Sequence, residues 1–181
     1  MFKCLTKQAI LALSCVLFHP GASAQVGVYS TLEDTLAAEF PNADIESKTL
    51  WLTKDIKAAM SDDLGFSLPG LRMRYWQSQD QTLWVLEEIG KEYPITFSYL
   101  VEGNISPSIA SAEVMEYREI RGGEVRHRFF TKQFVGANLT DGHLSQTIDG
   151  ITGATLSVNA MRKMAKTAIW LHSKVMRDEQ P

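Results

Sequence analysis

Four strand-like segments follow one another between residues 71 and 118, and only short polar turns separate them. Parallel neighbours need crossover connections of a dozen or more residues, whereas antiparallel neighbours can be joined by a tight turn. The turn signals fall at residues 78–80 (SQD) and 102–104 (EGN). The spacing therefore predicts an antiparallel or mixed sheet, with strands at residues 71–75, 82–89, 95–101 and 109–118.

Helices are predicted before and after this strand region. Residues 30–33 (STLE) have the pattern of a capping box, with Ser30 as the N-cap and Glu33 as its partner. Residues 45–52 form a further candidate strand, and Thr53 is expected to cap a second short helix. One long C-terminal helix is indicated by apolar residues at spacings of three and four, namely Met161, Met164, Ala165, Ala168, Leu171 and Val175. The predicted fold class is α+β, a sheet packed against helices.

The first 24 residues have the parts of a secretory signal. A basic start precedes a short apolar core at residues 9–18 (AILALSCVLF), and small residues at 22–24 (ASA) form a cleavage site. The apolar core is too short to span a bilayer comfortably. We expect a signal peptide at residues 1–24 and a single exported domain at residues 25–181.

Removal of this signal changes the chemistry available to the chain. Both cysteines, Cys4 and Cys15, lie in it, so the mature chain is expected to have no thiol, disulfide or cysteine metal site. Loss of Lys3 and Lys7 leaves 16 basic against 21 acidic residues, a net charge of −5. Phosphate backbones are bound by basic surfaces, so nucleic acid is not an expected partner.

Residues 149–155 (DGITGAT), called here the 149–155 motif, join a polar loop to the C-terminal helix. Gly153 permits a tight turn, and Ala154 is too small to shield its neighbour. Thr155 is expected at or just before the first helical turn, where backbone N–H groups lack partners and the helix dipole is positive. These donors would stabilise a phosphate attached to Thr155, and Ser157 could add a hydrogen bond.

A helix cap is the alternative interpretation of the motif. Ser and Thr are strongly preferred at N-caps, so Thr152 or Thr155 could serve only to begin the helix. For an isolated Gly-Ala-Thr sequence the cap is the more common role, and composition and spacing do not decide between the two.

Longer stretches of the sequence resemble the FMN-binding domain family. Asp149-x-x-Thr152-Gly153-Ala154-Thr155 is similar to the attachment signal of that family, in which the last Thr carries FMN through a phosphoester. Residues 90–96 (GKEYPIT), 117–125 (YREIRGGEV) and 130–136 (FTKQFVG) are similar to stretches common in its small exported members. The resemblance runs from about residue 80 to residue 172.

The resemblance implies a cofactor and a maturation partner. A Mg-dependent flavin transferase would cleave FAD and place FMN on Thr155, and Asp149, Thr152, Gly153 and Ala154 would belong to the signal that it reads. The related subunits of the sodium-pumping NADH:quinone reductase and the Rnf complex usually have Ser at the position of Thr152. They also keep a membrane helix, so a stand-alone exported carrier fits this chain better.

The resemblance also implies a role in electron transfer. The chain would pass electrons from a membrane redox partner, such as a cytochrome or a ferric-reductase-like protein, to an extracytoplasmic acceptor. It would lie in the periplasm, at the outer face of the cytoplasmic membrane, with no catalytic residue or metal site of its own. Two alternatives stay open, a flavin-dependent reductase of a small acceptor and a flavin-free accessory or binding module.

Three further groups of residues are candidates for parts of a site. Phe129, Phe130 and Phe134 could stack on a flavin, but such aromatic residues are more often core. Residues 121–123 (RGG) and Gly136 could shape a pocket, although loop glycines usually serve turns. The three histidines of the mature chain lack metal-ligand spacing and are expected at the surface or at caps, namely His127, His143 and His172.

Overall fold

The computed structural model describes residues 27–178 and shows an α+β fold. The predicted signal peptide lies outside the described residues. No helix within residues 27–178 is long and apolar enough to cross a membrane. Six strands form the main sheet: β1 (Gly27–Val28), β2 (Glu46–Trp51), β3 (Arg72–Ser78), β4 (Gln81–Ile89), β5 (Pro94–Glu102) and β6 (Ser108–Tyr117).

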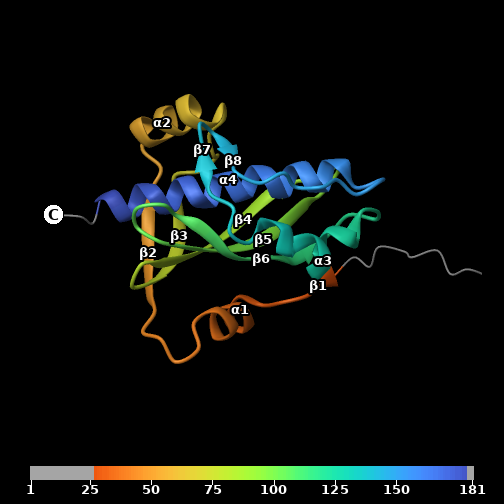
Figure 1. Ribbon diagram of the computed structural model, residues 1–181, viewed down its shortest axis with the longest axis horizontal. Helices are drawn as coiled ribbons and strands as arrows, with labels where there is room; N and C mark the ends of the chain where they lie inside the picture. Colours follow the sequence, from red (N-terminus) through yellow and green to blue (C-terminus); the bar gives the residue numbers. More distant parts are fainter. Residues whose placement is uncertain (1–26, 179–181) are drawn as a thin grey trace, which may run out of the picture.

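The main sheet is antiparallel throughout, in the order β1-β6-β5-β4-β3-β2 (Figure 1). Strands β2 to β6 follow each other in sequence order, and β1 closes the edge beside β6. The pairing of β3 to β6 agrees with the short turns predicted between residues 71 and 118. Its Gly27 lies opposite Tyr117 at the end of β6. Two register shifts between β5 and β6 mark irregularities of the kind that bend strands.

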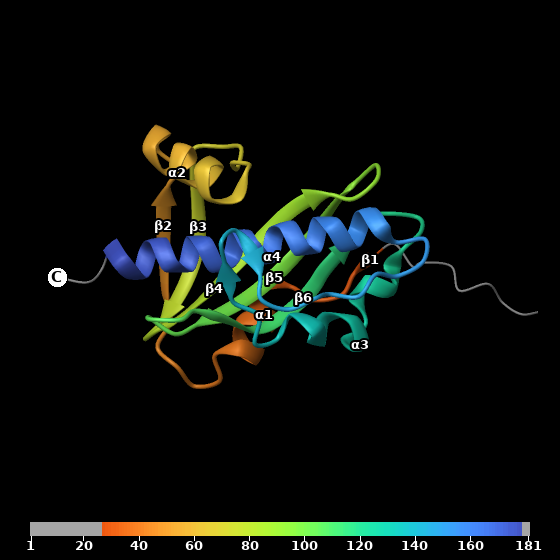
Figure 2. The same cartoon turned by 45° about the horizontal axis from the view of Figure 1, so that its top comes forward.

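A long helix, α4 (Thr155–Asp178), covers one face of the sheet and contacts β4, β5 and β6 (Figure 2). All six residues of its predicted apolar face are buried, so that sequence prediction is confirmed. The Tyr99 hydroxyl on β5 donates to the carbonyl of Met161 at 2.8 Å, which fixes the helix against the sheet. The N-terminal end of α4 lies at the end of the molecule that also carries β1 and the short helix α3 (Arg128–Thr131) (Figure 1).

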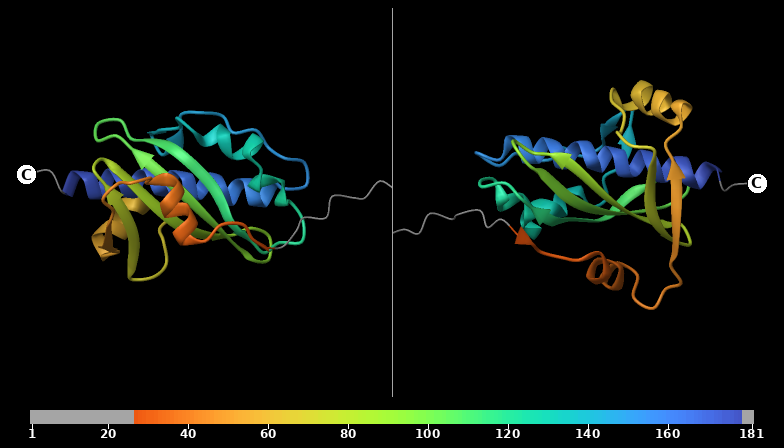
Figure 3. Two further views of the ribbon diagram at one scale, coloured as in Figure 1. Left: turned by 90° about the horizontal axis from the view of Figure 1, so that it is seen from below. Right: turned by 180° about the vertical axis from the view of Figure 1, so that it is seen from behind.

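Smaller elements complete the two sides. Helix α1 (Leu32–Glu39) lies on the face opposite α4 (Figure 3), where Phe40 packs with Leu83 and Leu100. Helix α2 (Lys54–Leu64) begins at the predicted cap Thr53 and lies beside α4, and its Asp63 accepts a hydrogen bond from Trp170 at 2.7 Å. A second hairpin, β7 (Leu139–Thr140) and β8 (His143–Leu144), also contacts α4.

The capping box of α1 is one residue later than predicted. Thr31, not Ser30, is the N-cap, and its hydroxyl accepts from the N–H of Asp34 at 3.1 Å. The Asp34 carboxylate accepts from the Thr31 N–H in return. An Asp side chain can accept from the N-cap N–H as a Glu side chain does. Residues 30–34 (STLED) therefore permit a capping box from either Ser30 and Glu33 or Thr31 and Asp34.

The expected surface or cap position of His172 is wrong, because its side chain is fully buried between α4 and the sheet. Its Nε2–H donates to the carbonyl of Gly103 at 3.0 Å, and its Nδ1 accepts from the Thr82 hydroxyl at 2.7 Å. The Thr82 oxygen accepts in turn from the Trp84 indole N–H at 2.7 Å. This chain of hydrogen bonds is complete with a neutral imidazole.

Acid is expected to weaken the fold through His172. Burial lowers the pKa of its imidazole. Below the unfolded pKa, the unfolded chain therefore binds a proton at His172 more readily than the folded chain does. The contribution of His172 to stability is present above the unfolded pKa of about 6.5 and is lost as the pH falls below it. Urea unfolding at pH 7.5 and 5.5 measures the loss, which His172→Gln should reduce and exposed His143→Gln should not. An equal pH dependence in wild type and His172→Gln would contradict this.

Candidate functional site

The 149–155 motif ends in a tight turn that leads directly into α4. The N–H of Ala154 donates to the carbonyl of Ile151 at 3.0 Å, so residues 151–154 form a β-turn. Gly153 has φ +83°, a value that suits Gly at the third position of a type II turn. A Cβ there would meet no other atom within 4 Å. Gly153 is therefore required by backbone conformation and not by space.

Helix α4 begins without a side-chain cap. The carbonyl of Ala154 accepts the first helical hydrogen bond, from Val158 at 2.9 Å, so Ala154 occupies the N-cap position and Thr155 is the first helical residue. Ala cannot cap, and within residues 27–178 neither Thr152 nor Thr155 makes a side-chain hydrogen bond. The N–H groups of Thr155, Leu156 and Ser157 likewise have no acceptor among these residues. The alternative that the motif merely caps the helix therefore loses its support.

A cavity of about 500 Å³ lies beside these free donors. Its size falls in the range of small-molecule and cofactor sites. Lys91 and Arg121 bring positive charge to it, and the exposed hydroxyl of Thr155 lies among its lining residues. The complete lining is Lys91, Glu92, Glu119, Ile120, Arg121, Gly153, Ala154, Thr155, Leu156 and Ser157. Glu92 and Glu119 balance these two cations in the lining, so the uncapped helix N-terminus is the feature that suits an anionic group.

The end of β6 is tied to the start of α4. The Tyr117 hydroxyl donates to the carbonyl of Arg121 at 2.5 Å, so the Ser157 hydroxyl must donate to Tyr117, at 3.0 Å. Burial raises the pKa of Tyr117 by more than the hydrogen bond from Ser157 lowers it, so the Tyr117 hydroxyl keeps its proton. The sequence predicts that the Ser157 hydroxyl donates to the phosphate, but in the structure this hydroxyl donates to Tyr117 instead. The backbone N–H of Ser157 remains available.

Gly122 packs directly against the turn at residues 151–154. It has φ +85°, and a Cβ there would lie 2.9 Å from the Tyr117 Oη and 3.1 Å from the Ala154 Cβ. Both backbone conformation and space therefore require Gly at this position. Of the residues suggested to shape a pocket, Arg121 lines the cavity and Gly122 lets the loop approach α4, whereas Gly123 and Gly136 do not line it.

Gly122→Ala should destabilise the domain by about 2 kcal/mol, because left-handed strain and a close contact act together. Gly70→Ala is a matched control, since Gly70 has φ +88° but a Cβ added there would meet nothing within 4 Å, and strain alone should cost about 1 kcal/mol. Urea unfolding measures both. Equal losses in the two variants would show that the contact with Ala154 is unimportant.

Glu119 holds the loop that forms another wall of the cavity. Its side chain is only 5% exposed, and one carboxylate oxygen accepts from the N–H groups of Lys91, Glu92 and Tyr93 at 2.5, 2.7 and 3.0 Å. Burial raises the pKa of Glu119, but the three backbone donors and the charge of Lys91 outweigh it and lower the pKa below its usual value. Glu119 therefore positions Lys91 at the cavity.

The remaining predicted residues lie around this centre. Asp149 and Thr152 are exposed and do not line the cavity, and the backbone N–H of Asp149 donates to the Gln133 side chain at 2.7 Å. Arg162 donates to the carbonyl of Ile148, so the loop before the turn is anchored at two points. Phe130 and Phe134 are core, as expected for such aromatic residues, whereas Phe129 is 57% exposed.

Residues 90–170 match the family model described as the FMN-binding domain. No curated protein matches the chain. The matched segment begins at the loop that Glu119 holds and ends within α4, so it contains every residue that lines the cavity. Residues 90–170 thus correspond to an FMN-binding domain, which supports a flavin-binding protein.

Proposed function

We propose that this chain is an exported flavoprotein that carries FMN in a phosphoester bond to Thr155 and transfers electrons between two partners. The observation that carries the proposal is the position of Thr155. Its exposed side chain stands at the first residue of an uncapped helix, beside a cavity of about 500 Å³. The family match supplies the identity of the ligand.

The residues at the cavity suit the phosphate end of FMN. A phosphodiester on Thr155 keeps one negative charge, which the free N–H groups of Leu156 and Ser157 and the helix dipole would stabilise. Arg121 makes no hydrogen bond or ion pair through its side chain within residues 27–178, so its guanidinium is available as well. The cavity beside these groups offers room for the rest of the cofactor.

Attachment requires a hydroxyl that an enzyme can reach. The Thr155 oxygen would form a bond to the flavin-side phosphorus of FAD while the pyrophosphate bond breaks, AMP leaves and the hydroxyl proton is lost. A flavin transferase would supply the catalytic groups for this step, with the 149–155 motif as its recognition signal. Exposure of Asp149, Thr152, Gly153 and Thr155 would let the transferase contact the motif.

The proposed role in electron transfer follows from what the bound flavin supplies, namely reversible acceptance and release of electrons. The protein would bind it, orient it and set its electrostatic surroundings through Lys91, Arg121 and the helix N-terminus. A membrane cytochrome or ferric-reductase-like protein is the proposed donor. Export to the periplasm is proposed from the signal pattern at residues 1–24.

Intact-mass analysis of the protein from its native host tests the attachment. We expect the mass of one FMN less one water, located by peptide mapping on the peptide that contains Thr155. Protein expressed without the transferase is the control and should lack the addition. Unmodified Thr155 in a host with an active transferase would overturn the covalent proposal, while tight non-covalent FMN would leave flavin binding intact.

Reductase activity is a second candidate, because Lys91, Arg121, Thr155 and Leu156 are all exposed at the cavity and a small acceptor could approach. Timed oxidation of the photoreduced protein by metal chelates and quinones distinguishes the two roles. Rapid and saturable oxidation by one acceptor would favour an enzyme. Slow, unsaturable oxidation by all of them would favour a carrier.

A further inference from the structure

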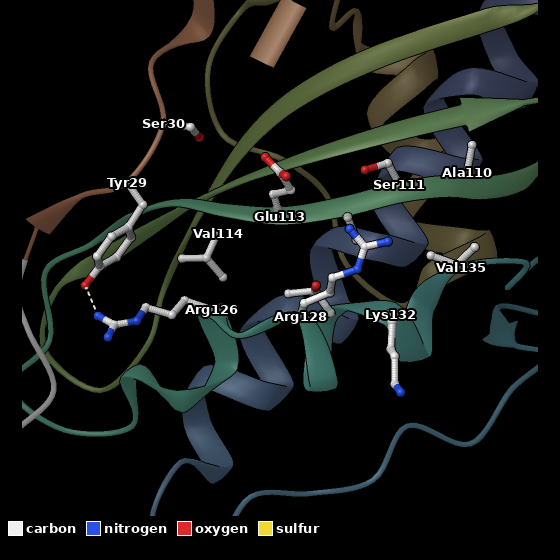
Figure 4. Close-up of a pocket in the computed structure, with 12 residues that line it drawn as sticks. Tyr29, Ser30, Ala110, Ser111, Glu113, Val114, Arg126, Arg128, Lys132 and Val135 are labelled. Carbon is white, nitrogen blue, oxygen red and sulfur yellow. Dashed lines mark hydrogen bonds between the residues drawn. The ribbon is translucent and has the colours of Figure 1, made fainter. Parts of the chain in front are cut away.

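A second cavity, of about 350 Å³, lies on the side of β6 near β1 and α3 (Figure 4). Its lining comes from three separate segments: residues 29–30, strand β6 at residues 110–114, and residues 126–135. Ala110, Ala112 and Val114 give it an apolar part. None of its lining residues belongs to the lining of the first cavity.

Two arginines bring positive charge to this second cavity. The guanidinium of Arg126 lies 4.7 Å from the centre of the Tyr29 ring and donates to the Tyr29 hydroxyl at 2.7 Å, so it is fixed in place. Arg128 extends from α3 toward β6, near Ser111 (Figure 4). Within residues 27–178 the Arg128 side chain makes no hydrogen bond and no ion pair within 4 Å. Lys132 is also at the cavity, but its ammonium points away (Figure 4).

Acidic groups only partly balance these charges. Glu113 points from β6 toward Ser30 (Figure 4) and is the one carboxylate among the described residues that line the cavity. Burial and the charge of Glu39 raise the pKa of Glu113, and Arg128 opposes that rise. Without Lys132, whose ammonium points away, the lining still has Arg126 and Arg128 against Glu113, so the cavity keeps a positive charge in a chain whose formal net charge is −3.

We propose that this second cavity is a binding site for a small organic oxyanion, a carboxylate or a phosphate, with Arg128 as its principal ligand. A guanidinium offers several N–H donors in one plane and binds such groups through paired hydrogen bonds. The hydroxyls of Ser30, Ser111 and Thr131 at the cavity can add donors. Its apolar part suits the carbon skeleton of the anion. The site does not depend on the flavin or on its attachment.

Amide NMR titration of the full exported protein with succinate and with inorganic phosphate, at constant ionic strength, tests the site. We expect saturable shifts at residues 110–114 and 126–132 with at least one of the two anions. Arg128→Gln should weaken that binding at least about tenfold. Arg74→Gln is a matched control, because Arg74 is an exposed arginine on β3 outside both cavities, and it should bind like wild type.

The two anions distinguish the chemistry of the ligand. Tighter binding of succinate would indicate a carboxylate ligand, and tighter binding of phosphate would indicate a phosphorylated one. Three results would overturn the proposal: no saturable shift with either anion, unchanged affinity in Arg128→Gln, or shifts confined to residues 155–157. The last result would place the anion at the start of α4 instead.

Discussion

Thr155→Val is expected to abolish covalent flavin completely and to leave the domain folded. Val nearly reproduces the shape of Thr but has no oxygen from which a phosphoester could form. The Thr155 side chain is exposed and makes no hydrogen bond within residues 27–178, so its loss should change the free energy of unfolding by less than about 0.5 kcal/mol. Intact mass and flavin fluorescence of the denatured protein measure attachment, and urea unfolding measures stability.

Thr155→Ser is the matched control for this experiment. It keeps the hydroxyl at the same place in the chain and should retain part of the attachment. Covalent flavin on the Val variant would mean that another residue carries the cofactor. Loss of the folded state in the Val variant would mean that Thr155 has a structural role that its contacts do not show.

Glu119→Ala is expected to destabilise the domain by about 3–4 kcal/mol, the largest loss that we predict for a single side chain. Its carboxylate accepts three backbone N–H bonds, and hydrogen bonds to charged groups contribute more than neutral ones. The released loop carries Lys91, so flavin attachment should also fall. Urea unfolding and intact mass measure the two effects.

Glu92→Ala is the control, because Glu92 lies on the same loop but its side chain makes only an exposed ion pair, with Lys91 at 3.4 Å, while its backbone N–H bond to Glu119 is kept in the variant. It should cost less than about 1 kcal/mol. Similar losses for Glu92→Ala and Glu119→Ala would show that the buried carboxylate does not hold the loop.

Glu119→Gln separates the charge of this residue from its geometry. The amide oxygen can still accept hydrogen bonds, so the variant should lie between wild type and Glu119→Ala at neutral pH. The pKa of Glu119 is lowered in the folded state, so its stabilising charge is present above the unfolded pKa of about 4.3 and is lost as the pH falls through the folded value. The advantage of wild type over Glu119→Gln should therefore shrink in acid. A difference that stays constant down to acid would show that hydrogen-bond geometry and not charge is responsible.

Local sequence signals predicted much of the fold because they depend on near neighbours. Short turns between residues 71 and 118 favoured antiparallel pairing, and the spacing of apolar residues defined the buried face of α4. The start of α4 at Thr155 also followed from the sequence. One error arose because the local sequence permits two N-caps for α1, Ser30 and Thr31. Another arose because His172 is buried by tertiary packing, which its neighbours in the sequence do not indicate.

The sequence by itself determined the α+β class with an antiparallel or mixed sheet, the family resemblance and the turn that presents Thr155. Only the tertiary structure decided what surrounds that residue. Glu119 reaches the loop at residues 91–93, and Gly122 meets Ala154, across separations of 26 residues or more that no local pattern encodes. The physical reason is that backbone conformation is set by adjacent residues, whereas a cavity exists only once distant strands and helices have packed together. The pairing of β6 with its neighbours and the docking of α4 bring these groups to one place.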